Sequence, residues 1–255
     1  MPTFRPRRRP RGGRWPTLLA WLALLLLIVA ALVMGGAGPA HRLEMMPLGT
    51  AFDLLRGGTY LALGAATLGL VTLTVASLCR RWRLALMGGL VLVVVAVMMA
   101  VPWQLMQRAQ MVPPIHDITT DMQDPPSFVA LVEAREAAPN AVDYPGEATA
   151  RQQREAYPEI QPLLLDQPLA SVRSAVEAAA LDQGWEIVAR TETGLEATAT
   201  TFWFGFQDDV AIRLTETPDG VRVDMRSASR LGASDVGTNA ARIQAFLEDL
   251  SQRLE

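Results

Sequence analysis

The sequence has no lysine, one cysteine and only two histidines among its 255 residues. The lone cysteine, Cys79, cannot form an intramolecular disulfide or contribute to a multi-cysteine zinc site. His116 is the only imidazole in the C-terminal half that could act as a base beside a nucleophile. The chain also lacks a Gly-x-Ser-x-Gly motif and a glycine-rich phosphate loop. We therefore expect neither hydrolase chemistry nor a cofactor.

Charge is distributed unevenly between the two halves of the chain. Residues 1–103 contain eleven arginines and two acids, a net charge of +9, whereas residues 104–255 contain twelve arginines and twenty-four acids, a net charge of −12. A domain with this excess of acids repels phosphate backbones, so nucleic-acid binding is not expected.

The N-terminal half contains three apolar segments long enough to cross a lipid bilayer, which takes about 20 helical residues. They cover residues 18–34, 57–79 and 84–101, within a region from 17 to 104 that follows an arginine-rich tail at residues 1–16. None of them contains a charged residue, so we interpret them as an anchor and not as a transport path. Tryptophans suited to the headgroup layer lie at or near the ends of these segments: Trp15, Trp21, Trp82 and Trp103.

Arginine placement predicts how these spans are oriented. The tail contains six arginines, and the connection between the second and third spans contains three more. The other side has only Arg42, Arg56 and Arg108 near the membrane. The positive-inside rule therefore places the N-terminus in the cytoplasm and the C-terminal domain outside it. The rival interpretation is a cleaved signal peptide ending near residues 36–40, but the apolar stretch is longer than a usual signal core.

The second span carries small residues at four-residue spacing, namely Gly58, Ala62 and Ala66. Such a stripe lets two helices approach closely. It could form the contact face of a homo-oligomer, or it could pack against the other spans of the same chain. The second interpretation is favoured, because three helices in one chain must pack in any case.

A proline-rich segment follows at residues 112–166, with eight of the nine prolines found between positions 112 and 168. This density disfavours long helices and predicts an extended segment that wraps onto the core. Within it we expect short strands near His116–Thr120 and Phe128–Val132, and a helical turn near Ala148–Tyr157.

The last part of the chain, residues 167–255, has the pattern of an α+β core. Asp166 and Pro168 predict the start of a helix that ends before Gly184. Strands are expected at residues 185–191, 195–203, 208–215 and 221–227. A final helix is expected to start between Asp235 and Asn239. The order α-β-β-β-β-α predicts an antiparallel sheet with both helices on one face, so the fold class is three transmembrane helices followed by a soluble α+β domain.

The sheet face away from the helices is polar. It can be interpreted as a solvated face, or as a docking surface for the proline-rich segment or for a partner. In the hairpin that turns at residues 218–220, two registers keep the apolar faces together. One pairs Asp209 with Arg226, and the other pairs Arg213 with Asp224.

Several motifs in the C-terminal half are distinctive: PIHDITTD (114–121), PPSF (125–128), AYPEI (156–160), GWEIV (184–188), EATATT (196–201), GFQDDVAIR (205–213), VDMRSASR (223–230) and SDVGTN (234–239). With these motifs the chain resembles a bacterial family catalogued as domain of unknown function 1499, many members of which are membrane-anchored. Taken together with the three predicted spans and their arginine asymmetry, the resemblance to a bacterial family predicts a multi-pass protein of the inner membrane with a periplasmic domain. It implies no known activity and no catalytic residue.

Two groups of residues are candidate binding sites. The first would suit a phosphate or carboxylate near the start of the last helix and consists of Arg226, Ser227, Ser229, Arg230, Ser234 and Asn239. The simpler interpretation is that aspartates neutralise these arginines while Ser234 or Asp235 caps the helix. The second group would offer oxygen and imidazole ligands to a cation and consists of His116, Asp117, Asp121 and Asp124. Its simpler interpretation is a strand start whose polar side chains bond nearby backbone.

We therefore expect a non-enzymatic, membrane-tethered protein of the cell envelope whose C-terminal domain binds a partner protein or an envelope ligand. The alternative is an enzyme that acts on an anionic envelope metabolite through the Arg226–Ser234 region. A deep pocket lined by Arg226, Arg230 and a carboxylate would favour the enzyme. A filled core beneath a flat polar sheet face would favour the binding protein.

Overall fold

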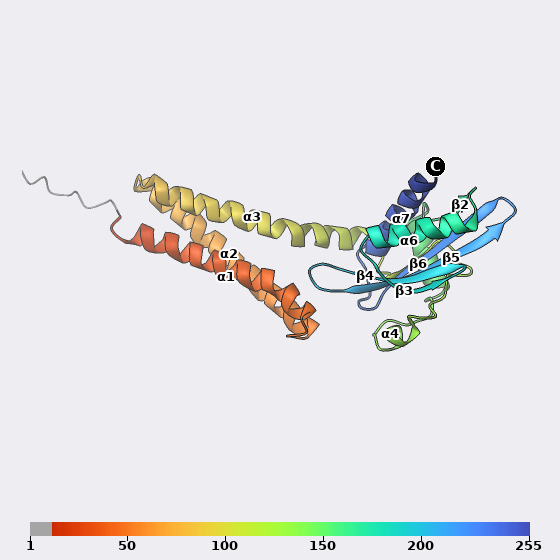
Figure 1. The fold of residues 1–255 in the computed structure, drawn as a ribbon. Helices are drawn as coiled ribbons and strands as arrows, with labels where there is room; N and C mark the ends of the chain where they lie inside the picture. The colour runs from red at the N-terminus through yellow and green to blue at the C-terminus, as the bar shows by residue number, and fades with distance from the viewer. Residues whose placement is uncertain (1–11) are drawn as a thin grey trace, which may run out of the picture. The chain divides into compact units, whose positions relative to one another are not determined.

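The computed structural model describes residues 12–255 and divides the chain into two compact units, one ending at Gln104 and the other beginning at Leu105 (Figure 1). The first unit is formed by α1 (Trp15–Arg42), α2 (Leu48–Leu78) and the greater part of α3 (Trp82–Met111). All three helices are long and apolar enough to cross a membrane. The protein therefore has the three candidate spans that the sequence predicts.

The helices extend beyond the apolar segments that predicted them. α1 continues through Pro39, and α3 continues through Pro102, where the third span was expected to end. A proline removes one backbone donor but leaves the hydrogen bonds of the other turns intact. Hydropathy therefore located the apolar centre of each helix and underestimated its length.

The small residues of α2 pack inside the helical unit. Gly58 lies so close to Met34 of α1 that a side chain at this position would overlap the methionine. Ala62 is fully buried among residues of the three helices, and Ala66 packs against the same cluster. The stripe thus makes contacts within the chain, and a homo-oligomer through the same residues stays a prediction.

Arg81 joins the two arginine-rich segments of the helical unit, the connection between α2 and α3 and the start of α1. Its guanidinium donates to the Gly13 carbonyl oxygen and to Thr17 Oγ1, each at 2.9 Å. The connection between α2 and α3 therefore lies beside the start of α1, as three consecutive antiparallel spans require.

The second unit is built on an antiparallel sheet. A meander of β3 (Glu186–Thr191), β4 (Gly194–Thr200), β5 (Gln207–Thr217) and β6 (Gly220–Ser229) forms most of it, close to the predicted strands. Two short strands from the proline-rich segment, β1 (Asp117–Thr119) and β2 (Leu163–Leu165), both pair with β6. β1 was expected, whereas β2 was not.

Both long helices of this unit cover one face of the sheet, as predicted (Figure 1). They are α6 (Leu169–Asp182) and α7 (Thr238–Leu254). Their apolar stripes meet the inward side chains of the strands in a single core, in which Trp185 stacks on Phe246 with 5.1 Å between ring centroids. Two shorter helices, α4 (Val132–Glu136) and α5 (Glu147–Ala156), belong to the proline-rich segment. The second of them, α5, lies where a helical turn was expected, near Ala148–Tyr157.

Two local predictions were wrong. α6 begins at Leu169 with Pro168 as its N-cap residue, so Asp166 does not cap it. The strand expected near Phe128–Val132 is a turn that leads into α4. The Glu196 carboxylate of β4 accepts the backbone N–H groups of residues 129 to 131 at 2.9 to 3.1 Å, which holds this segment in a turn. A contact so distant in sequence has no local signal.

The β5–β6 hairpin adopts the second of the two predicted registers. Arg213 lies opposite Asp224, and the two side chains form an ion pair at 3.2 Å. Asp209 lies opposite Ala228 instead of Arg226. The proline-rich segment covers this outer face of the sheet, where Phe128 and Leu131 pack on Ala211 and Ala228. The polar face is thus a docking surface for a segment of the same chain.

Candidate functional site

A buried ion-pair network lies between the outer face of the sheet and the segment that covers it. At its centre the Asp209 carboxylate accepts hydrogen bonds from Arg135 at 3.0 Å, from Arg230 at 2.8 Å and from the Thr198 hydroxyl at 2.9 Å. The side chains of Arg135 and Asp209 are both 0% exposed. Burial lowers the pKa of Arg135, and the Asp209 carboxylate opposes that effect.

Arg226, the first residue of the candidate anion site, is bound by a carboxylate of this same chain. Its guanidinium donates to both oxygens of Asp117 at 2.8 and 3.0 Å, and it also donates to the Val142 carbonyl. The ring of Phe128 lies 4.6 Å from the guanidinium carbon. Only 3% of the side chain is exposed, so Arg226 joins the sheet to its cover and offers little surface to a free anion.

The remaining residues of the candidate anion site do not converge on one point. β6 runs through Ser229, so its side chains alternate between the two faces of the sheet. Arg226 and Arg230 bind Asp117 and Asp209 on the outer face. Ser227 and Ser229 face the opposite way, where both hydroxyls bond the Asn239 side chain.

Local contacts occupy the start of α7 as well. The Ser234 hydroxyl accepts the N–H of Val236, and the Asp235 carboxylate accepts the N–H groups of Gly237 and Asn239 at 2.8 Å. Burial raises the pKa of Asp235, although these two N–H donors oppose the shift. The N-cap residue of α7 is Gly237 and not Ser234 or Asp235, although the Asp235 side chain binds an N–H of the first turn.

Three of the four candidate metal ligands bind arginines of this chain. Asp117 binds Arg226, while Asp121 and Asp124 both bind Arg213. Burial would raise the pKa of Asp121, but backbone N–H donors and two nearby guanidiniums outweigh it and hold this pKa below its usual value. Within residues 12–255 no three acidic, histidine or cysteine side chains are grouped as a metal would require.

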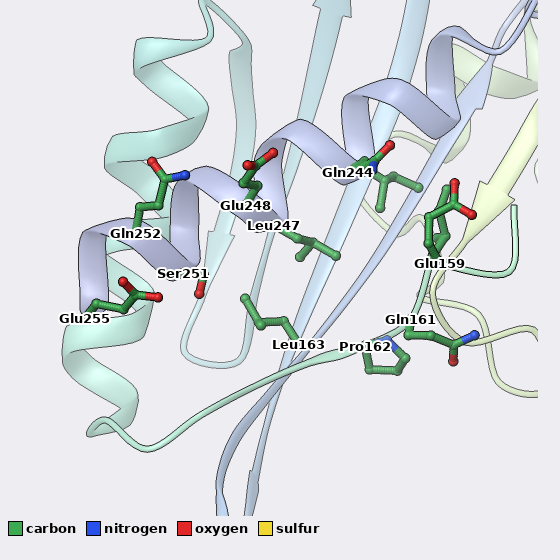
Figure 2. Close-up of a pocket in the computed structure, with 12 residues that line it drawn as sticks. Glu159, Gln161, Pro162, Leu163, Gln244, Leu247, Glu248, Ser251, Gln252 and Glu255 are labelled. Carbon is green, nitrogen blue, oxygen red and sulfur yellow. The ribbon is translucent and has the colours of Figure 1, made fainter.

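A groove remains on the helical side of the domain, between α7 and the chain leading into β2. It encloses about 430 Å³. Leu163 and Leu247 face each other across it (Figure 2). The buried side chains of Ile160 and Ile243 also line it. The rim is polar and is formed by Glu159, Gln161, Gln244, Glu248, Ser251, Gln252 and Glu255.

The comparisons with known proteins decide the family and leave the activity open. The family described as a protein of unknown function, DUF1499, matches residues 117–250, more than half of the chain. The chain belongs to this family. No curated protein matches it. The crystal structure of protein MLL2253 from Mesorhizobium loti is similar at 15% identity and a TM-score of 0.30, over 37% of this chain and 96% of that one.

The groove of this DUF1499 domain differs in charge from the outer face. In the described part of the chain, Glu159, Glu248 and Glu255 take part in no ion pair, whereas Asp117, Asp209 and Asp224 on the outer face are each bound by an arginine. The groove lining contains three glutamates and no arginine. It can therefore receive an apolar side chain in its floor and cationic groups at its rim.

Arg135 and Asp209 are the central residues that sequence reasoning did not single out as a site. One signal was available, because Asp208 and Asp209 directly precede the apolar run Val210–Ile212 in a strand. Acids in a buried strand are rarely left without a partner. The sequence offered no means of choosing Arg135, which lies 74 residues away from Asp209.

Proposed function

We propose that this DUF1499 protein is a membrane-tethered, extracytoplasmic binding protein whose groove along α7 takes a cationic, partly apolar segment of an envelope protein. The observation that carries the proposal is the pairing of an apolar floor with glutamates that have no arginine partner within the described residues. Leu163 and Leu247 are half-buried and so partly accessible, and accessible apolar side chains rimmed by charge of one sign are typical of a site for a partner of the opposite sign.

Arginine distribution supports the extracytoplasmic placement. Nine arginines belong to the tail and to the connection between α2 and α3, against three near the membrane on the other side. The bond between Arg81 and the start of α1 is consistent with both arginine-rich segments sharing one side. The positive-inside rule assigns that side to the cytoplasm.

The alternative function, an enzyme for an anionic envelope metabolite, draws no support from the Arg226–Ser234 region. Its two arginines donate to buried aspartates, and its serines bond Asn239 or local backbone. A substrate anion would have to displace Asp117, which accepts two hydrogen bonds from Arg226, or Asp209, which is bound by Arg135, Arg230 and Thr198. The binding function requires no such rearrangement.

Peptide binding tests the groove. We expect a fluorescent hexapeptide of alternating arginine and leucine to bind the full-length protein in detergent, with an affinity that falls as salt is added. The double variant Glu159→Gln/Glu248→Gln should bind about threefold to tenfold more weakly, because each exposed charge contact is worth roughly 0.2–1 kcal/mol. Fluorescence anisotropy measures the dissociation constants.

A matched control separates the groove from the general acidity of the domain. Glu186→Gln/Glu192→Gln removes the same charge from exposed residues of β3 and the following turn, and it should leave the affinity nearly unchanged. Equal losses of affinity in the two double variants would show that peptide binding depends only on the net charge of the domain. That result would reject the groove as the binding site.

Reporter fusions test the orientation. Alkaline phosphatase fused after Gln110 should be active in intact cells, because that enzyme folds only outside the cytoplasm, and a cytoplasmic reporter at the same position should be inactive. Fusions after Arg83 should give the reverse pattern. Activity of the cytoplasmic reporter after Gln110 would place the domain on the cytoplasmic side.

A further inference from the structure

The loop between β4 and β5 exposes aromatic side chains. Residues 201–206 read Thr-Phe-Trp-Phe-Gly-Phe, and no charged residue lies between Glu196 and Asp208. Phe202 is 89% exposed and Trp203 is 38% exposed. The domain has a net charge of −12, so an exposed loop that is apolar and uncharged stands out from the rest of its surface.

The loop has a defined shape. The Thr201 hydroxyl accepts the N–H of Phe206, and backbone bonds join Thr201 to Phe206 and to Gly205. Gly205 adopts a φ of +71°, which suits glycine. The rings of Phe204 and Phe206 stack with 5.0 Å between centroids. The exposed rings are therefore presented by an ordered turn, which lowers the entropy cost of binding.

The loop lies at the end of the sheet where the chain enters the domain. Gln207, the first residue of β5, accepts the N–H of Arg230 through its backbone carbonyl. The neighbouring Ser229 donates its N–H to the His116 carbonyl, and Asp235 donates to that of Ile115. Residues 115 and 116 come only a few positions after the end of α3, so the aromatic loop and the link to the anchor share one end of the domain.

We propose that the aromatic loop, residues 201–206, inserts Phe202 and Trp203 into the interfacial layer of the bilayer that holds the anchor. Tryptophan and phenylalanine favour this layer, because their rings leave water while the indole N–H keeps a polar partner. The absence of charge in the loop removes the main cost of insertion. The loop thus forms a second membrane contact, which fixes one end of the domain at the surface.

Spin labels on the full chain test this contact. Cysteines are placed singly at Phe202 and at Asp219 in a Cys79→Ser background, labelled with a nitroxide and reconstituted in nanodiscs of phosphatidylcholine. Asp219 is the control because it lies in the β5–β6 turn, at the other end of β5. The ratio of oxygen to nickel-complex accessibility should be about threefold or more higher at position 202, since oxygen partitions into apolar layers and the nickel complex into water.

A second variant adds an independent readout. Trp203→Gln should lower the ratio at position 202, because the chain labelled there has already lost Phe202 and this change removes the second of the two inserting rings. Equal ratios at positions 202 and 219 would overturn the proposal. Protection of position 202 from both reagents would overturn it as well, because the loop would then be covered by protein.

Discussion

Asp209→Ala is expected to lower the free energy of unfolding of the C-terminal domain by about 3–5 kcal/mol, the cost of leaving a buried charge without its partner. Arg135 is fully buried, and Asp209 is the carboxylate bound to it. The substitution also removes the acceptor of Arg230 and of the Thr198 hydroxyl. Water cannot replace these bonds without opening the cover formed by the proline-rich segment.

Proteolysis in increasing urea measures this loss on the full-length chain in detergent, because the cleavable core of the domain becomes accessible only on unfolding. Glu177→Ala is the matched control. It breaks an ion pair with Arg190 whose side chains are 40% and 51% exposed, and it should cost about 1 kcal/mol or less. A loss for Asp209→Ala as small as that of the control would mean that the network contributes little to stability.

The strands and long helices could be predicted because their signals are local. Alternation located β3 to β6, and the apolar stripe of α7 placed Ile243, Phe246 and Leu250 in the core. The hairpin register was narrowed to two near the turn, since a shift by one residue would turn apolar residues toward the outer face. In these elements the residues that are apolar in the sequence pattern are also the residues that the fold buries, so the pattern alone was enough to predict them.

The cover and the site depend on contacts between residues far apart in sequence. Glu196 fixes the turn before α4, and Asp117 and Asp209 bind arginines 109 and 21 residues away. The anion site was grouped by closeness in sequence, on the assumption that the last strand ended at Ser227. Because β6 continues to Ser229, neighbouring residues of the group face opposite sides of the sheet.

Phe246→Ala should also cost about 3–5 kcal/mol, because it removes a fully buried ring and leaves a cavity. Phe246 joins α7 to the sheet side of the core through its stack on Trp185. Leu164→Ala, at a side chain that is 52% exposed, should change the same free energy of unfolding by only a few tenths of a kcal/mol. Comparable losses in both variants would show that α7 is not held by this ring.

The same helix links stability to the proposed binding. Phe246 points into the core, whereas Leu247 and Glu248 line the groove (Figure 2). Phe246→Ala should therefore weaken both the fold and peptide binding, since a loosened α7 no longer holds one wall of the groove. Glu159→Gln/Glu248→Gln should weaken binding alone. The affinity of Phe246→Ala is measured under conditions in which this variant is still folded. If its peptide affinity is unchanged, the binding surface does not depend on the position of α7.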